Sequence, residues 1–203
     1  MTDHHVADHP SSADPVAADP TAGAPASVCV LGVGNELFTD EGLGVVAARE
    51  VGGWGLPGVE ALDGGTLGLA LAPEIADRDC LLILDAITAA GRVPGELIEL
   101  RGEQVPAHHA QVMSVHQIQL GDALAAAELS GVLPKRIVAL GIVPFDLTTG
   151  FGLSEPMRAR LPDLLSAARR VLDEWSRSAP PTPRRLEPIE PRPTEEESTP
   201  CTK

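Results

Sequence analysis

The chain has 203 residues, of which 43% are hydrophobic and 2% aromatic, and its 29 acidic and 15 basic residues give a net charge of −14. This balance argues against broad nucleic-acid binding, which needs a basic face to neutralise phosphates, and against electrostatic docking on an anionic membrane. The hydrophobic content excludes a wholly disordered chain. No apolar run reaches the roughly 18–20 residues of a membrane-spanning helix. From the charge and from the lack of such a run, we expect neither nucleic-acid nor membrane partners.

The two ends of the chain differ in composition from its middle. Residues 1–26 contain four Asp and four Pro but no Lys or Arg, and residues 177–203 contain seven of the 19 prolines. Segments of this kind bury too little apolar surface to offset chain entropy. We therefore predict a disordered tail at 1–26, a single domain at 27–176 and a disordered, Pro-rich tail at 177–203.

Cysteine usage and the N-terminus bear on the cellular compartment. Cys29, Cys80 and Cys201 form no CxxC pair, so they predict neither a disulfide framework nor a zinc cluster. Residues 1–26 lack the basic and apolar regions of a secretory signal. The simplest expectation is a cytoplasmic protein.

Apolar runs predict the strands of a sheet. Residues 28–33, 80–84 and 137–143 are unbroken runs rich in Val, Ile and Leu, typical of strands buried on both faces of a parallel sheet. Residues 59–62 form a weaker strand. Residues 96–101 follow the second long run after too few residues for a parallel crossover, so this strand should pair antiparallel at an edge.

Helical periodicity fills the gaps between these strands. We expect helices at about 41–51, 66–76, 115–129 and 155–175. Pro162 lies inside the last of them, which should kink or effectively begin there. The fold class is therefore α/β, a three-layer sandwich with a mostly parallel five-stranded sheet, one antiparallel edge strand and helices on both faces.

A glycine pair after the first strand resembles a dinucleotide-binding motif, but the pattern is incomplete. Gly32 and Gly34 fit the first two positions of GxGxxG, whereas Leu37 stands where the third glycine is needed. Asp40 and Glu41 follow, and carboxylates at a helix start would repel a pyrophosphate. Helix capping is the alternative for both acids, and we favour it for Asp40.

Two further residues stand at the ends of predicted elements. Asp85 closes a strand expected at the centre of the sheet, on the edge where open α/β sheets bind ligands, although capping of the next turn explains it equally well. Ser114 and Gln117 form a capping box that places His116 in the first turn of the next helix. The helix dipole there favours neutral imidazole, the form that binds metals, although a single histidine is more often structural.

Glu41, Asp85 and His116 should meet at one edge of the sheet, because each follows a different strand or loop that ends there. A Glu, Asp and His set with open positions suits a divalent transition metal. The chain has no GxSxG elbow, HExxH motif or P-loop. We place His108 and His109 in the loop before the helix at 115–129.

Four blocks of sequence resemble, in order and spacing, the signatures of the nickel–iron hydrogenase maturation endopeptidases. They read LGVGNELFTDEGLG at 31–44, DGGTLG at 63–68, LILDAI at 82–87 and MSVHQ at 113–117. The resemblance covers roughly residues 27–175. It implies a peptidase that removes a short C-terminal extension from the large-subunit precursor of the hydrogenase once nickel has been inserted.

The resemblance also implies roles for individual residues. The metal-contacting positions of the family fall on Glu41, Asp85 and His116, and a further carboxylate of the cleft falls on Asp63. Nickel would be supplied by the substrate precursor, which is the implied partner, and we expect a monomer. Either the metal activates water or polarises the scissile carbonyl, or Asp40 or Asp63 acts as general base. A non-catalytic nickel-binding chaperone and a nucleotide-binding accessory protein are the alternative functions.

Overall fold

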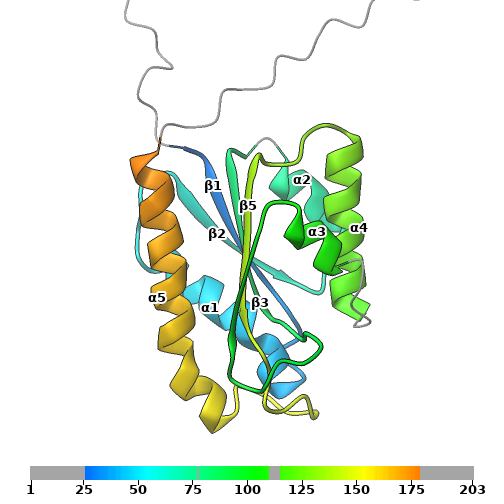
Figure 1. The fold of residues 1–203 in the computed structure, drawn as a ribbon, viewed down its shortest axis with the longest axis vertical. Helices are drawn as coiled ribbons and strands as arrows, with labels where there is room; N and C mark the ends of the chain where they lie inside the picture. The colour runs from blue at the N-terminus through cyan, green and yellow to red at the C-terminus, as the bar shows by residue number, and fades with distance from the viewer. Residues whose placement is uncertain (1–25, 77, 110–114, 179–203) are drawn as a thin grey trace, which may run out of the picture.

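A five-stranded sheet in the order β2-β1-β3-β5-β4 forms the middle layer of the molecule (Figure 1). Its strands are β1 (Val28–Val33), β2 (Val59–Gly65), β3 (Cys80–Ala86), β4 (Leu97–Arg101) and β5 (Arg136–Ile142). The first three strands and β5 are parallel, whereas β4 pairs antiparallel with β5 at the edge. The predicted sheet, including its antiparallel edge strand, is confirmed.

The computed structural model describes residues 26–76, 78–109 and 115–178, and it describes the side chains of these ranges except at 107–109 and 115–119. Nearly all of both predicted tails lies outside these ranges, so the domain boundaries at 26 and 177 stay predictions. None of the helices in the described part of the chain combines the length and apolar content that a bilayer crossing requires.

Helices cover both faces of the sheet, which completes the predicted sandwich (Figure 1). Helices α1 and α5 lie on one face, and α2, α3 and α4 lie on the other. The helical elements are η1 (Thr39–Gly42), α1 (Leu43–Gly52), η2 (Gly68–Leu71), α2 (Ala72–Ile75), α3 (Gln104–His109), α4 (Val115–Leu129) and α5 (Glu155–Arg177).

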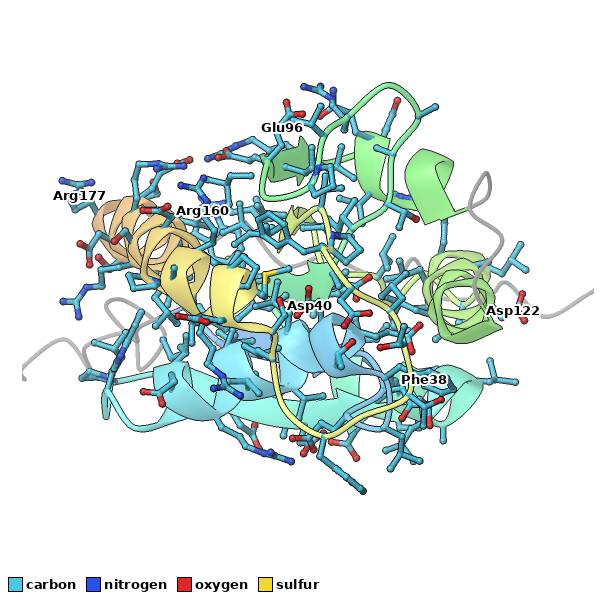
Figure 2. All side chains as sticks on the ribbon, turned by 90° about the horizontal axis from the view of Figure 1, so that it is seen from below. Phe38, Asp40, Glu96, Asp122, Arg160 and Arg177 are labelled. Carbon is cyan, nitrogen blue, oxygen red and sulfur yellow. The ribbon has the colours of Figure 1, made fainter. Side chains whose placement is uncertain are left out.

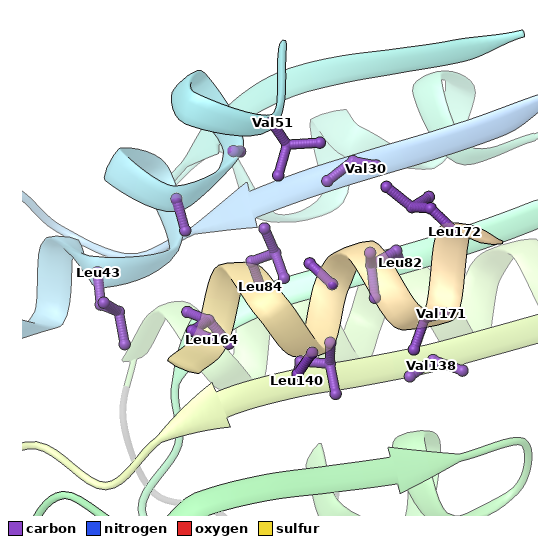
Figure 3. Packing of buried hydrophobic residues seen from close by; sticks show 14 of the residues in the cluster. Val30, Leu43, Val51, Leu82, Leu84, Val138, Leu140, Leu164, Val171 and Leu172 are labelled. Carbon is purple, nitrogen blue, oxygen red and sulfur yellow. The ribbon is translucent and has the colours of Figure 1, made fainter. Parts of the chain in front are cut away.

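The two hydrophobic layers follow from the alternation of side chains along the strands. In β3, Leu82 and Leu84 face the cluster under α1 and α5 (Figure 3), whereas Leu81 and Ile83 face the cluster under α2 and α4. All seven residues of β3 are buried, as expected for a central strand with helices on both sides. The core is mostly aliphatic, with Trp175 as its one aromatic residue among the described side chains.

Two details of the helices differ from the predictions. Helix α5 starts at Glu155, with Ser154 as its N-cap, so Pro162 lies inside a continuous helix and does not begin it. The segment with His108 and His109 was predicted as a loop, which is wrong, because its backbone forms α3. Val105, fully buried against α4, fixes this short helix on the sheet.

Candidate active site

The carboxyl ends of the parallel strands gather four of the predicted site residues at one edge of the sheet. Asp63 lies near the end of β2, and Asp85 is the last residue but one of β3. Asp40 and Glu41 belong to η1, which follows β1 and contacts β3. Figure 2 looks onto this edge and shows Asp40 near its centre.

Glycines allow η1 and the start of α1 to lie directly on the strand ends. A Cβ atom at Gly44 would overlap the carbonyl oxygens of Leu84 and Val33. Gly34 has a φ of 131°, and a Cβ atom there would overlap the carbonyl oxygen of Glu41. The glycine pattern after β1 therefore serves close packing, and η1, which carries Glu41, contacts β3.

Asp85 is a carboxylate held inside the protein at the end of the central strand. Its side chain is fully buried, and its Oδ1 atom accepts a hydrogen bond from the backbone N–H of Ala86 at 2.7 Å. In the register of β3 and β5 it lies opposite Gly141. Open α/β sheets bind ligands at the carboxyl ends of their strands, so the position of this carboxylate fits a metal contact.

Asp40 is also fully buried, but its oxygens are engaged by distant parts of the chain. Its Oδ2 atom accepts hydrogen bonds from the backbone N–H groups of Phe145 (3.0 Å) and Asp146 (2.9 Å) and from Ser154 Oγ (3.0 Å). Its Oδ1 atom accepts from the backbone N–H of Ser154 at 2.8 Å. The expectation that Asp40 caps its own helix is therefore wrong: it anchors the loop between β5 and α5.

This anchoring bears on the predicted catalytic role of Asp40. A general base needs a lone pair within reach of the attacking water. Asp40 has no exposed surface and accepts four hydrogen bonds, so its geometry suits a structural role better than proton transfer. The catalytic assignment of Asp40 stays a prediction that this arrangement disfavours.

Asp63 lies in a more open environment at the same edge. Its side chain is 44% exposed, and its Oδ2 atom pairs with Arg49 Nη2 at 2.7 Å. Arg49 also forms a two-pronged ion pair with Glu36, and these two acids raise the pKa of its guanidinium. Exposed ion pairs of this kind contribute little because water and salt screen them. Since nearly half of its side chain is exposed, the Asp63 carboxylate is open to water.

Glu41 and His116 complete the predicted metal site. Glu41 is half-buried in η1, and its backbone N–H donates to the carbonyl oxygen of Phe38 at 2.8 Å. His116 is the second residue of α4, which runs from the carboxyl edge back toward the start of β5 (Figure 1). The side chain of His116 and the cap residue Ser114 lie outside the described parts of the structure, so the capping box is not tested.

The meeting of Glu41, Asp85 and His116 therefore stays a prediction. No three His, Cys, Asp or Glu side chains in the described part of the chain form a group that could hold a metal, and the imidazole of His116 is not among them. The donor set itself, two carboxylates and one imidazole, is chemically suited to nickel.

The loop between β5 and α5 was given no role from the sequence, yet it covers part of this edge. Thr39 Oγ1 donates to the carbonyl oxygen of Asp146 at 2.7 Å, and Phe38 and Gly150 form an isolated parallel β-bridge. Figure 2 shows the yellow loop curving around Asp40. The two sides of these contacts are more than a hundred residues apart in the sequence, so local pattern could not predict them. The one sequence feature that pointed to a special carboxylate was the position of Asp40 beside a helix start.

Comparison with known proteins identifies the family. The family model described as hydrogenase maturation protease matches residues 52–171, which is more than half of the chain. The chain belongs to the hydrogenase maturation protease family. The hydrogenase 2 maturation protease of Escherichia coli is 41% identical over 150 residues, covering 72% of this chain and 91% of that protein.

Other family members agree in sequence and structure. The hydrogenase expression/formation protein HupD of Bradyrhizobium diazoefficiens is 40% identical over 162 residues, covering 75% of this chain and 84% of that protein. The solved structure of the hydrogenase maturating endopeptidase HybD from Escherichia coli superimposes with a TM-score of 0.69 at 39% identity, covering 72% of this chain and 92% of that one. The predicted family and its peptidase class are confirmed, whereas the roles of individual residues stay predictions.

Proposed function

We propose that this hydrogenase maturation protease removes the C-terminal extension of a nickel–iron hydrogenase large-subunit precursor after nickel insertion. The observation that carries the proposal is the placement of Asp85. A buried carboxylate stands near the carboxyl end of the central strand, and glycines let η1, which carries Glu41, pack closely on the strand ends and contact β3. The protein would act on the precursor as a monomer in the cytoplasm.

Nickel belongs to the substrate in this proposal. Glu41 and Asp85, joined by His116 from the start of α4, would contact the nickel carried by the precursor and so position the bond to be cut. Hard carboxylate oxygens and one imidazole suit transient contact with a borderline metal better than permanent storage. The metal thus marks a precursor that is ready for processing.

Water is the proposed nucleophile. A cysteine nucleophile reacts as its thiolate, and burial raises the pKa values of both Cys29 and Cys80 to about 11. Both thiols are buried and stay protonated near neutral pH. A carboxylate that faces water is therefore the better activating group, and Asp63 is the candidate general base because it lies exposed at the same edge.

The experiment that tests this function is a cleavage assay. The full chain is mixed with purified, nickel-loaded precursor, and the released peptide is identified by mass spectrometry. A single C-terminal peptide released by the wild type supports the protease, and D63N should release it at least about a hundredfold more slowly if Asp63 is the base. Binding of the precursor without any released peptide would instead indicate a nickel-binding chaperone.

A further inference from the structure

All three phenylalanines of the chain lie on two loops at the carboxyl edge, and all are exposed to water. Phe38 is 37%, Phe145 38% and Phe151 84% exposed, and Leu37 and Leu147 on the same loops are about half exposed. We call these five residues the apolar rim. In a chain with few aromatic residues and a mostly aliphatic core, such placement indicates a contact surface.

The apolar rim is held in a fixed shape by backbone pairing between its two loops. The N–H of Thr39 donates to the carbonyl oxygen of Gly150 (3.0 Å), and the N–H of Gly150 donates to that of Leu37 (2.9 Å). Beneath this pairing, Asp40 binds the backbone of Phe145. A surface ordered before binding loses less conformational entropy when a partner docks.

The apolar rim is continuous with the candidate active site. One 3-10 turn joins Phe38 to Glu41, whose N–H donates to the carbonyl oxygen of Phe38 at 2.8 Å. A partner segment lying on the rim is therefore one helical turn from Glu41 and close to the end of β3.

Charge distinguishes between possible occupants of the rim. Each copy of this chain carries a net charge of −14, and the repulsion between two such chains opposes self-association. Asp146 is half-buried and lies in the sequence between the rim residues Phe145 and Leu147, and hydrogen bonds from Thr148 lower the pKa of its carboxyl group. An apolar partner segment with a neighbouring basic residue complements this surface.

We infer that the apolar rim binds an apolar segment of the hydrogenase large-subunit precursor, flanked by a basic residue and adjacent to the bond that is cut. This inference rests on the proposed function. It adds a second recognition element, so that the nickel contacts report the state of the precursor while the rim supplies affinity.

The test compares matched exposed-apolar substitutions in the full chain. F151S combined with L147S removes two side chains of the rim, whereas L129S removes a leucine that is 90% exposed at the far end of α4. Steady-state cleavage of nickel-loaded precursor gives KM and kcat, and surface-immobilised precursor gives the Kd for each variant. Melting curves check that both variants stay folded.

We expect the rim variant to raise both KM and Kd about tenfold or more, with kcat within about twofold of the wild type and no change for L129S. An equal Kd of the rim variant and the wild type for the precursor would overturn the inference. So would a wild-type dimer in sedimentation that becomes monomeric in the rim variant, because a second copy would then cover the surface. If the wild type binds but does not cleave, the proposed function fails, while the Kd comparison still decides the role of the rim.

Discussion

Asp40 and Asp85 are the two fully buried charged side chains in the described part of the chain, and they lie at the same edge of the sheet. Asp40 accepts hydrogen bonds from residues 105 to 114 positions away, which fixes the loop before α5. Asp85 stands at the end of the central strand, and the hydrogen bonds of its side chain include one from its own neighbour Ala86. Burial alone therefore does not identify a functional carboxylate: the long-range hydrogen bonds of Asp40 show that it organises the fold, whereas the case for Asp85 rests on its place at the strand end.

The largest expected effect is on catalysis, from D85N. Asparagine has nearly the same shape as aspartate but lacks the negative charge that would bind the metal. Cleavage of nickel-loaded precursor should therefore fall at least about a hundredfold. Asparagine also keeps the shape of the side chain and the hydrogen bond from Ala86, so we expect the free energy of unfolding to fall by no more than about 2 kcal/mol. Cleavage kinetics and urea unfolding measure the two effects. Normal cleavage by D85N would remove Asp85 from the site.

The converse is expected of D40N. The amide offers one acceptor oxygen where the carboxylate has two, so its NH₂ group would meet backbone N–H donors. We expect the free energy of unfolding to drop by about 3 kcal/mol, since hydrogen bonds to a charged group are involved. Urea unfolding measures this loss, and cleavage well below the melting temperature should fall far less than in D85N. An unchanged stability with abolished cleavage would make Asp40 the catalytic carboxylate.

H116A tests the third predicted metal contact. Alanine favours helices, so α4 should persist while the imidazole is lost, and cleavage should drop strongly. S114A is the matched control, because loss of the predicted cap should destabilise the helix by about 1 kcal/mol while the imidazole stays in place. Circular dichroism and cleavage assays of both variants separate the two effects. Full activity in H116A would assign His116 a structural role.

The smallest effect concerns the buried thiols. Because burial raises the pKa values of Cys29 and Cys80 to about 11, both thiols of the native protein should resist alkylation at pH 8. Treatment of the native protein with the alkylating reagent should therefore leave its cleavage activity unchanged. The contribution of the two thiols to stability is fully present below pH 9, the ordinary pKa of the group, and is lost as the pH rises through about 11. Mass spectrometry of labelled peptides and urea unfolding at pH 8 and 10.5 measure both. Rapid native labelling of Cys80 with loss of cleavage would argue for a thiol mechanism.

Local pattern predicted most of the fold. The bounds of α4 and the antiparallel direction of β4 follow from periodicity and from the short connection after β3, both of which are properties of neighbouring residues. Helix α3 was missed because burial of Val105 against α4, a tertiary contact, fixes it. The same holds at the site: Asp85 could be placed from its strand, whereas the partners of Asp40 come from a loop far along the chain.

Recognition of the nickel in the precursor by the carboxyl edge of the sheet is the central step of the proposed function. The direct measurement is the rate of peptide release by the wild-type protein from the same precursor prepared with nickel and without metal. We expect release from nickel-loaded precursor to be at least about a hundredfold faster than from metal-free precursor, and D85N should abolish this difference. Equal rates from both precursors would contradict metal recognition, even with the protease assignment intact.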